Sequence, residues 1–435
     1  MSSSPTTVVK RAARVFYREG LRGVASRVKA RVRGPAAAPP PLPASSTSDG
    51  RAELLAQIAN QLEWSRFAVL EETAAARFGN GRPAPRRGKQ SLLMLIPEPE
   101  RGSGGRTTMA RVLRHLAARG TTCYVAFYPE VAPDRFADCR DAWFDEFGSD
   151  FCTVLPPAEA TALDFDIAMA TYWPGAYVVK NCISAASKGY FVQDFEPEFH
   201  APGSFYAFAE ETYRLGLWGV CASPWLASLL SSHYGMPTAG FLLGVDKNEY
   251  HLDPLVARED NLVVAYIRRH TERRGYELLM WALKVLKDRM PGVRIEIFGD
   301  GRLPSDGGFL WIDKNHGILR HEQLRELYNR SAVGIVTSFT NYSLIPNEMM
   351  ACGCAVVDLD TPCMRTAFPP GVVALERATP QCLAAAAESL LTDRGARTVQ
   401  VRKGLEYIST IGWEQSLAAI EAAIARFSSK RPATL

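Results

Sequence analysis

Four arginines follow an apolar segment in the second half of the chain, and together they could hold a diphosphate. The segment Asn261–Tyr266 is predicted to form a strand, and Arg268, Arg269, Arg273 and Arg274 come directly after it. A guanidinium group can bind phosphate oxygens through two parallel hydrogen bonds. The spacing therefore predicts a diphosphate site where this strand ends. The alternative is a solvated basic turn.

Two further segments of the same half could contact a nucleotide. Gly299 follows the predicted strand Arg294–Phe298, and a glycine lets the backbone approach a ligand closely. The polar turn 338–344 leads into a helix, so its last amides can meet phosphate, while the Glu348 carboxylate can accept hydrogen bonds from hydroxyl groups. The predicted ligand-binding residues of this half are Arg268, Arg273, Arg274, Gly299, Asn341, Tyr342, Ser343, Leu344 and Glu348.

Acidic residues end a predicted strand in the first half of the chain. Gln193, Asp194 and Glu196 follow an apolar run that Pro197 prevents from continuing. The carboxylates of Asp194 and Glu196 could take a proton from a hydroxyl group or bind sugar hydroxyls; the alternative is a solvated turn with a helix-capping acid. After the predicted strand Asp166–Ala170, Tyr172 and Trp173 could stack on a sugar or could be core aromatics.

A glycine-rich segment, with glycines at 102, 104 and 105, separates the predicted strand Leu92–Ile96 from the predicted helix Thr107–Arg119. Bare amides of Gly104 and Gly105 at such a position can receive an anion; the alternative is a plain tight turn. The dinucleotide fingerprint needs a further glycine where Thr107 stands, so a nicotinamide dehydrogenase is disfavoured.

Alternating strands and helices predict how these residues are positioned. The strands of the first half are expected at Leu92–Ile96, Cys123–Tyr128, Asp166–Ala170, Gly189–Gln193, Trp218–Ala222 and Ala239–Leu243, and those of the second at Asn261–Tyr266, Arg294–Phe298, Ala332–Thr337 and Cys354–Asp358. This α/β pattern predicts two Rossmann-like, doubly wound parallel sheets over 91–252 and 253–412, with a hinge at Asp253–Asp260. A closing helix, Glu414–Arg426, lies within 413–435. A ligand cleft is expected between the carboxyl ends of the two sets of strands.

The net charge of +4 hides an uneven distribution. Residues 1–34 carry nine Lys or Arg and one Glu, a net +8, so the remainder carries −4. The first segment predicts a basic amphipathic helix that could lie on an anionic membrane surface; a solvated tail is the alternative. A Pro/Ser-rich linker (35–50) and a helical lead-in (51–90) follow. Since the basic excess lies outside the folded body, nucleic acid is excluded as a partner.

Metal and disulfide chemistry find little support in the sequence. The nine cysteines are scattered without a CxxC pair, which predicts reduced thiols with packing roles. The pair Asp358 and Asp360 has the spelling of a metal-binding motif but follows a strand expected to be buried, so no metal is expected. No apolar run approaches the ~18 residues of a membrane span. We therefore expect a cytoplasmic protein, soluble or peripheral on the inner face of the membrane.

The motifs of the second half, taken together, resemble the carboxyl-terminal domain of retaining GT-B glycosyltransferases of family 4. Strand, arginine loop, Gly-Asp-Gly and a polar turn leading to Glu-Met-Met-Ala-Cys-Gly occur in the same order. That family usually has two glutamates separated by seven residues; here Glu348 is the second, and Thr340 stands at the first position. The segments Tyr266–Arg274 and Gln193–Phe199 resemble rhamnosyltransferases that use dTDP-L-rhamnose. The resemblance covers about residues 91–426.

The resemblance implies a GT-B fold, with an acceptor domain over 91–252 and a nucleotide-sugar domain over 253–412. It implies metal-free transfer of L-rhamnose from dTDP-L-rhamnose, with retention, to a polysaccharide or lipid-linked glycan. The implied catalytic residues are Asp194, Arg268 and Arg274; Gln193 stands where many relatives have histidine, and Asp194 could be catalytic or acceptor-orienting. The implied acceptor-binding residues are Gln193, Asp194, Glu196, Tyr172 and Trp173, and Gly104 and Gly105 join the sugar-donor site. The alternatives are a GT-B transferase for another nucleotide sugar and a non-catalytic glycan- or nucleotide-sugar-binding partner in polysaccharide assembly.

Overall fold

The structure is a computed structural model that describes residues 82–85, 88–97, 104–128, 133–304 and 308–429. The predicted basic extension (1–34), the linker (35–50) and most of the lead-in (51–90) lie outside the described residues. The helix predicted in that lead-in, Ala52–Phe78, lies among the residues that are not described. Arg82 and Pro83 form a short strand, and Gln90 already begins the next one.

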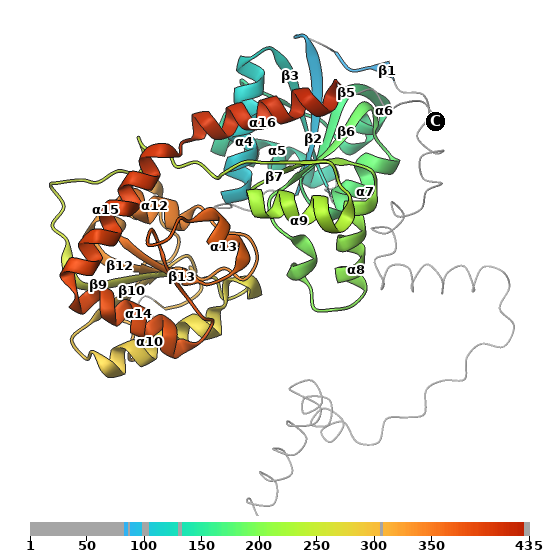
Figure 1. Ribbon diagram of the computed structural model, residues 1–435. Coiled ribbons are helices and arrows are strands. Elements are labelled where there is room, and N and C mark those ends of the chain that lie inside the picture. The colour runs from blue at the N-terminus through green and yellow to red at the C-terminus, as the bar shows by residue number, and fades with distance from the viewer. Residues whose placement is uncertain (1–81, 86–87, 98–103, 129–132, 305–307, 430–435) are drawn as a thin grey trace, which may run out of the picture. The chain divides into compact units, whose positions relative to one another are not determined.

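In the described part of the chain, eight parallel strands form a first sheet (Figure 1). They are β1 (Arg82–Pro83), β2 (Gln90–Ile96), β3 (Thr121–Phe127), β4 (Thr153–Val154), β5 (Leu163–Ala170), β6 (Ser184–Val192), β7 (Trp218–Cys221) and β8 (Thr238–Gly240). Their order is β4-β3-β2-β5-β6-β7-β8, with β1 paired to β5. Along β2, Leu92, Met94 and Ile96 join one apolar cluster, while Leu93 and Leu95 join another. The sheet is therefore apolar on both faces, as a parallel sheet covered by helices must be.

A second sheet contains six parallel strands, again counted over the described residues. They are β9 (Glu259–Tyr266), β10 (Arg294–Phe298), β11 (Lys314–Asn315), β12 (Ser331–Ile335), β13 (Ala355–Leu359) and β14 (Ala374–Glu376). Their order is β11-β10-β9-β12-β13-β14. Both sheets lie in one compact unit. The predicted architecture of two Rossmann-like parallel sheets is confirmed, whereas the exact domain boundaries stay predictions.

Helices cover both sheets. They are α4 (Gly104–Ala118), α5 (Pro133–Phe147), α6 (Pro157–Ala162), α7 (Trp173–Asn181), α8 (Ser204–Glu211), α9 (Pro224–Tyr234), α10 (Tyr276–Arg289), α11 (His321–Arg330), α12 (Ile345–Ala351), α13 (Pro362–Ala367), α14 (Pro380–Thr392), α15 (Arg394–Thr410) and α16 (Trp413–Ser428). The last helix, red in Figure 1, packs on α4 and on strands of the first sheet. Its Phe427 stacks on Trp218 at 5.5 Å, and Glu421 meets His115 at 2.8 Å. The predicted closing helix therefore returns the chain to the first domain.

The direction of strand addition reverses once in each sheet. In the first sheet the reversal lies between β2 and β5, and in the second between β9 and β12. Loops after neighbouring strands diverge at such a point and leave a crevice at the carboxyl ends. The segments that sequence analysis singled out follow β5, β6, β9, β10 and β12, so the topology brings them to these two sheet edges.

Two elements have bounds that differ from those predicted. The strand expected over Ala239–Leu243 stops at Gly240, and the following residues run toward the second sheet. The helix expected to begin at Thr107 begins at Gly104, so Gly104 and Gly105 form its first turn and do not belong to a preceding loop. The remaining strands of both halves are confirmed, with ends shifted by a few residues.

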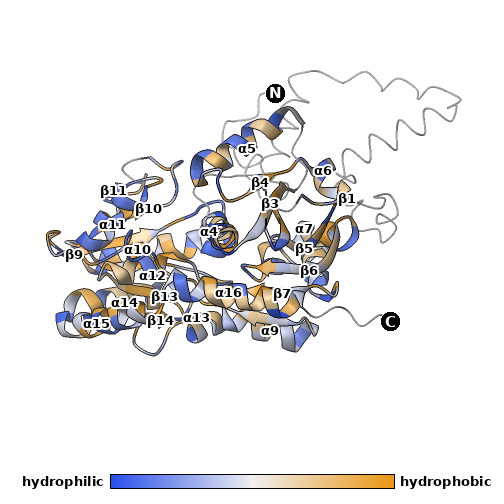
Figure 2. Cartoon of the chain, turned by 90° about the horizontal axis from the view of Figure 1, so that it is seen from above, coloured by the Kyte–Doolittle hydropathy of each residue, from blue (hydrophilic) through white to orange (hydrophobic). Residues whose placement is uncertain are grey.

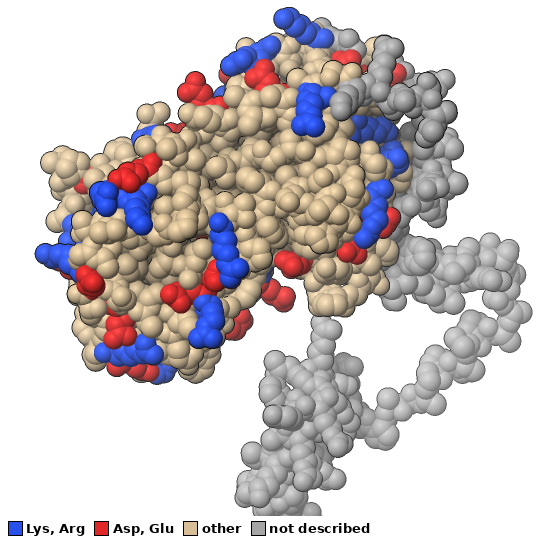
Figure 3. All heavy atoms as spheres, viewed as in Figure 1, with Lys and Arg blue, Asp and Glu red and all other residues tan. Residues whose placement is uncertain are grey.

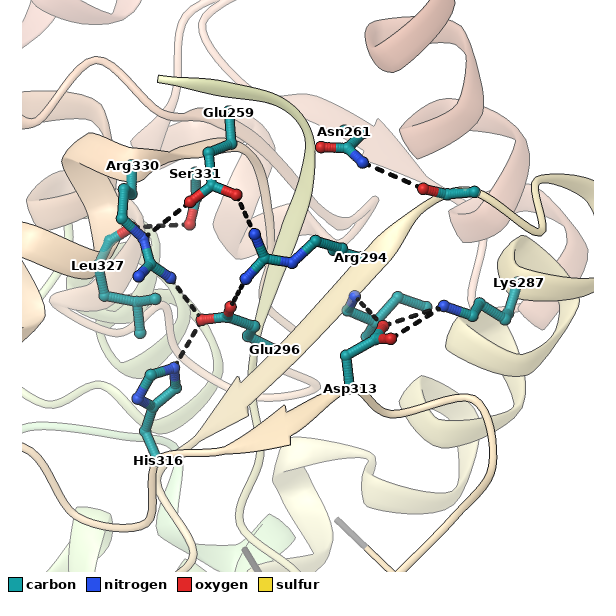
Figure 4. Close-up of polar contacts among 12 residues, drawn as sticks. Glu259, Asn261, Lys287, Arg294, Glu296, Asp313, His316, Leu327, Arg330 and Ser331 are labelled. Carbon is teal, nitrogen blue, oxygen red and sulfur yellow. Dashed lines mark hydrogen bonds and ion pairs between the residues drawn. The ribbon is translucent and has the colours of Figure 1, made fainter. Parts of the chain in front are cut away.

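A buried ionic network supports the second sheet around β10, between the amino ends of its strands and the loop after β11 (Figure 4). The side chain of Glu296 on β10 is 1% exposed, and it contacts Arg294, Arg330 and His316 at 2.5–2.7 Å. Although burial alone would raise the pKa of Glu296, the hydrogen bond with His316 and the neighbouring arginines lower it to about 2. Because His316 precedes Gly317, whose carbonyl accepts a hydrogen bond from the amide of Gly299, the network fixes the loop beside the end of β10.

The described surface is mixed in character. Figure 2 shows apolar residues gathered on strands and on inward helix faces, with hydrophilic residues outside. On the face shown in Figure 3, basic and acidic side chains are interspersed. Among the described helices, none combines the length and the apolar composition that crossing a lipid bilayer requires.

Candidate functional site

A cavity of about 750 Å³ is lined by residues from both sheets. This volume lies within the range of about 300–1,000 Å³ of ligand sites. The cavity wall consists largely of loops at the carboxyl ends of β5, β6, β9, β10 and β12, together with the start of α4. The predicted site residues that line it are Gly104, Gly105, Tyr172, Gln193, Asp194, Glu196, Arg268, Arg273, Arg274, Gly299, Tyr342, Ser343, Leu344 and Glu348. Trp173 and Asn341 do not line it.

Two glycines in the first turn of α4 lie close to other residues of the cavity wall. A Cβ atom on Gly105 would lie 3.1 Å from the Oε1 atom of Gln193, so a larger residue would displace this amide. A Cβ atom on Gly104 would lie 3.5 Å from Leu344 of the second domain. The helix start therefore forms part of the cavity wall and packs closely against both domains.

Three of the predicted arginines, Arg268, Arg273 and Arg274, line the cavity. Arg268 donates from Nη1 to the carbonyl of Gly299 at 3.5 Å, and Arg274 donates to the hydroxyl of Ser338. Each of these bonds uses one nitrogen of a group that carries five N–H donors. Arg269 is exposed and lies outside the cavity, which corrects its inclusion in the arginine cluster. Because Arg273 is paired with Asp194, the geometry leaves Arg268 and Arg274 as the phosphate-binding candidates.

Gly299 is required by the turn after β10. Its φ of 102° lies in the left-handed region, and a Cβ atom would come within 2.6 Å of the carbonyl of Ile267 and 2.7 Å of the ring of Tyr266. Any larger residue would push β9 and β10 apart at their carboxyl ends. The turn itself therefore requires glycine at this position of the cavity wall. The predicted close approach of a ligand to its backbone is a separate role.

Asp194 joins the two domains through both of its carboxylate oxygens. Oδ1 accepts hydrogen bonds from the amides of Phe195 at 2.9 Å and Asn341 at 2.8 Å. Oδ2 lies 3.3 Å from Nε of Arg273, whose guanidinium carbon lies 4.0 Å from the ring centre of Phe199. Since both oxygens already have partners, this arrangement favours an orienting role over proton abstraction. Both roles of Asp194, catalytic and acceptor-orienting, stay predictions.

Asn341 forms an interdomain contact and does not line the cavity, so its role in ligand binding stays a prediction. It is 1% exposed, and its Nδ2 atom donates to the carbonyls of Gln193 at 2.9 Å and Ala222 at 2.7 Å. Its Oδ1 atom accepts a hydrogen bond from the thiol of Cys363. The side chain has its polar atoms satisfied within the protein and none directed into the cavity.

Tyr342 and Asn347 hold the segment after β8. The amide of Leu243 donates to the hydroxyl of Tyr342 at 2.6 Å, and the carbonyl of Leu243 accepts from Nδ2 of Asn347 at 3.0 Å. Both backbone groups of one first-domain residue are therefore bound by the second domain. Tyr342 lines the cavity, but its hydroxyl serves this contact.

Glu348 and Ser343 carry polar atoms that the protein leaves unsatisfied. Oε2 of Glu348 and Oγ of Ser343 are buried and have no hydrogen-bond partner among the described residues, and both residues line the cavity. Burial, followed by repulsion from Glu249, raises the pKa of Glu348 to about 8. At neutral pH the carboxyl is therefore largely protonated and can both donate and accept. An unsatisfied buried polar group costs about 1–3 kcal/mol, which a polar ligand would relieve.

The raised pKa of Glu348 predicts a stability that falls with pH. The folded state holds this proton up to about pH 8, whereas the unfolded state loses it near 4.5. The bound proton therefore contributes fully to the free energy of unfolding below pH 4.5. This contribution is lost as pH rises through 8, by up to about 1.4 kcal/mol per pH unit. Glu348→Gln removes this term. In urea unfolding at pH 5, 7 and 9, the free energy of unfolding of wild type should fall relative to that of the variant as the pH rises.

A matched control is Glu326→Gln, an exposed change on α11. This variant should follow the wild-type pH dependence. Burial also raises the pKa of Glu196 and Asp358 to about 8, but these groups are common to all three proteins and cancel in the comparison. Parallel curves for wild type and Glu348→Gln would contradict the assignment.

Glu196, which lines the cavity, holds Trp173 behind the cavity wall. Oε2 of Glu196 accepts a hydrogen bond from the amide of Trp173 at 2.6 Å. Trp173 is 5% exposed and packs edge-on against His200 and Phe205. This burial favours the alternative of a core aromatic for Trp173, whose role in acceptor binding stays a prediction. Tyr172 remains in the cavity wall.

Sequence reasoning missed several cavity residues. Arg111 lies on the face of α4 that carries Gly104, seven residues earlier, so helical spacing could have found it. It pairs with Asp246 at 2.8 Å and Glu249 at 3.3 Å and lies over the ring of Trp413. No local signal marks Asp246 or Trp413, because they reach the cavity only through the linker between the sheets and the return of α16.

Metal-ligating side chains do not gather into a candidate site in the part of the chain that the structure describes. It contains no set of three or more His, Cys, Asp or Glu side chains arranged to hold an ion. Asp358 is buried in β13, and Asp360 pairs with Arg365. The nine cysteines are free thiols, seven of them buried, in agreement with the predicted packing roles. The expectation of a metal-free reaction stays a prediction.

Comparisons with known proteins agree with this geometry. Residues 270–419 match the family model described as Glycosyl transferase-like. The O-antigen biosynthesis protein RfbC of Myxococcus xanthus is 33% identical over 273 residues, which cover 62% of this chain. The matching segment covers only 21% of that relative's length.

Solved structures show the fold. HepE of Anabaena, crystallised with UDP and glucose, has a TM-score of 0.59 at 14% identity, covering 78% of this chain and 99% of that chain. TarM has a TM-score of 0.60 at 10% identity, covering 79% and 99%. WaaG, a glycosyltransferase of lipopolysaccharide biosynthesis, has a TM-score of 0.53 at 12% identity, covering 78% and 100%. The predicted GT-B fold is confirmed.

Proposed function

We propose that this chain is a retaining glycosyltransferase that transfers L-rhamnose from dTDP-L-rhamnose to a polysaccharide or lipid-linked glycan. The observation that carries the proposal is the cavity between the carboxyl ends of the two sheets. Arg268 and Arg274 line it beside the unsatisfied Glu348 carboxyl and Ser343 hydroxyl. Cationic groups for a diphosphate thus lie in the same cavity as polar groups for ribose or sugar hydroxyls.

The residues of the second domain would act on the sugar donor. As the bond between sugar and diphosphate breaks, negative charge grows on the leaving phosphate oxygens. Arg268 and Arg274 would stabilise that charge from fixed positions, which is where preorganised groups have their largest effect. Glu348, protonated at neutral pH, would donate to one hydroxyl oxygen and accept from another. In this proposal no metal takes part.

The residues of the first domain would orient the acceptor. Gln193 and Glu196 line the cavity, and Asp194 holds Arg273 in place beside them. The name of the Myxococcus relative, an O-antigen biosynthesis protein, supports a polysaccharide product. Because the match covers only 21% of that relative, it supports only a part of the relative's activity. We further propose that the enzyme works in the cytoplasm, with residues 1–34 directing it to the inner face of the membrane.

Turnover of purified protein with different sugar donors tests the proposal. We expect release of dTDP from dTDP-L-rhamnose, by hydrolysis or transfer, and no comparable release of diphosphate from UDP-glucose or GDP-mannose. Because HepE has been crystallised with UDP-glucose, that donor is the most informative comparison. Turnover of UDP-glucose alone would reject rhamnose but keep glycosyl transfer. Binding of a nucleotide sugar without any turnover, with acceptor glycan present, would favour the non-catalytic alternative.

A further inference from the structure

A second cavity of about 530 Å³ lies beside the first. One side comes from residues 199–205, which end in the first turn of α8, and the other from residues 270–273, after β9. Phe199, Thr271 and Arg273 line both cavities, so these three residues form the partition between them. A ligand in the second cavity would therefore lie next to the contents of the first.

The partition is held from both domains. The guanidinium group of Arg273 lies over the ring of Phe199 at 4.0 Å, and its Nε atom meets Asp194 at 3.3 Å. The carbonyl of Arg273 also accepts a hydrogen bond from the amide of Phe339 at 3.0 Å. With its charge already paired by Asp194, Arg273 separates the two cavities without making the second one strongly cationic.

An aromatic surface forms one wall of the second cavity. Phe205 is 51% exposed although it is a large apolar residue, and it lies against His200 with 5.6 Å between ring centres. The buried Trp173 packs edge-on against both rings and fixes them from behind. An aromatic face carries partial negative charge and attracts the weakly positive C–H groups of a pyranose ring.

Polar groups surround this aromatic surface. Ser204, His270, Thr271 and Glu272 supply hydroxyl, imidazole and carboxylate groups to the wall. The Nε2 atom of His200 is buried and has no hydrogen-bond partner within the described residues. A mixture of donors and acceptors around one aromatic surface suits a neutral, hydroxyl-rich ligand, whereas a diphosphate would meet the carboxylate of Glu272.

We propose that the second cavity is a saccharide-binding subsite that holds the acceptor glycan, with one hydroxyl group directed past Phe199 toward the first cavity. Its role as an acceptor site rests on the proposed function, but binding of a saccharide there does not. Phe205 provides the stacking surface. His270 and Glu272, which belong to the second domain, bind hydroxyl groups of the saccharide. The subsite thus draws on both domains and exists only when they are together.

Saturation-transfer NMR on the full-length protein tests this proposal. The probes are methyl α-L-rhamnopyranoside, methyl α-D-glucopyranoside and methyl α-D-galactopyranoside, with dTDP as a separate probe of the first cavity. We expect at least one glycoside to bind. Phe205→Ala should raise its Kd by about 2- to 10-fold, the effect of one aromatic contact. His270→Ala should also weaken binding, while dTDP binding stays unchanged in both variants.

The controls separate stacking from folding and from donor binding. Phe205→Trp keeps an aromatic face and should retain glycoside binding. Trp281→Ala removes an aromatic that is 59% exposed on α10, outside both cavities, and should change neither probe. Absence of binding by all three glycosides, or unchanged binding in Phe205→Ala and His270→Ala, would overturn the subsite. If dTDP and UDP both fail to bind wild type, the proposed function fails instead, whatever the glycosides do.

Discussion

Arg274→Ala is expected to lower kcat for sugar transfer by about 10²- to 10³-fold. A fixed cationic donor at a developing negative charge contributes effects of this size. The variant should fold, because Arg274 is half-buried and its side chain makes one hydrogen bond, to Ser338. Burial holds the pKa of the neighbouring Asp358 at about 8, so at neutral pH no ionised carboxylate is left without its counter-ion. Steady-state release of dTDP from dTDP-L-rhamnose, or from whichever donor is turned over, measures the effect.

Arg269→Ala is the matched control for this prediction. Arg269 comes from the same segment after β9 and carries the same charge, but its side chain is exposed and lies outside the cavity. We expect near-wild-type kcat, which would show that position and not net charge matters. Arg274→Lys should fall between wild type and alanine, since an ammonium group keeps the charge but loses the two-pronged geometry. Equal losses in Arg269→Ala and Arg274→Ala would reject the diphosphate site.

Asp194→Asn is expected to lower kcat/KM by about 10²-fold through Arg273. The new amide oxygen can still accept from Phe195 and Asn341, but its NH₂ group would face Nε of Arg273, and two donors cannot pair. Release of Arg273 would misplace the partition beside the reacting groups, and displacements of about 1 Å cost this much. We also expect a loss of about 1–3 kcal/mol in urea unfolding from the unpaired group.

A double-mutant cycle distinguishes positioning from proton abstraction. If Asp194 acts by orienting Arg273, Arg273→Ala should show a similar loss, and the double variant should be no worse than either single one. The pH dependence of kcat/KM should keep its shape in Asp194→Asn. A loss far larger than that of Arg273→Ala, together with disappearance of one limb of the pH profile, would identify Asp194 as a general base.

The large features of the fold could be predicted because they depend on local patterns. An unbroken apolar run such as Leu92–Ile96 is typical of a strand buried on both faces, and regular alternation with helices requires parallel pairing. Once two such sheets are inferred, residues that follow strands must collect at the carboxyl edges. This reasoning alone placed Arg268, Arg274 and Glu348 around one cavity, although they are up to 80 residues apart.

Which neighbour faces the cavity could not be predicted. Asn341 and Ser343 lie two residues apart in one polar turn. The side chain of Asn341 is hydrogen-bonded between the domains, whereas the hydroxyl of Ser343 remains unsatisfied at the cavity wall. Trp173 and Tyr172 divide in the same way between core and cavity. In a turn without regular periodicity, side-chain direction depends on the partners that packing supplies, and those partners come from the other domain.

The sequence by itself therefore determined the two-sheet architecture, the edge at which ligands bind and the residue types that follow the strands there. Only the tertiary structure decided that Asp194 is paired on both oxygens, that Arg111 and Trp413 join the cavity, and that residues 199–205 and 270–273 enclose a second one. The physical reason is the range of the interactions. Strand formation and strand order follow from nearby residues and chain connectivity, whereas these contacts join segments that meet only when both domains and the final helix have packed.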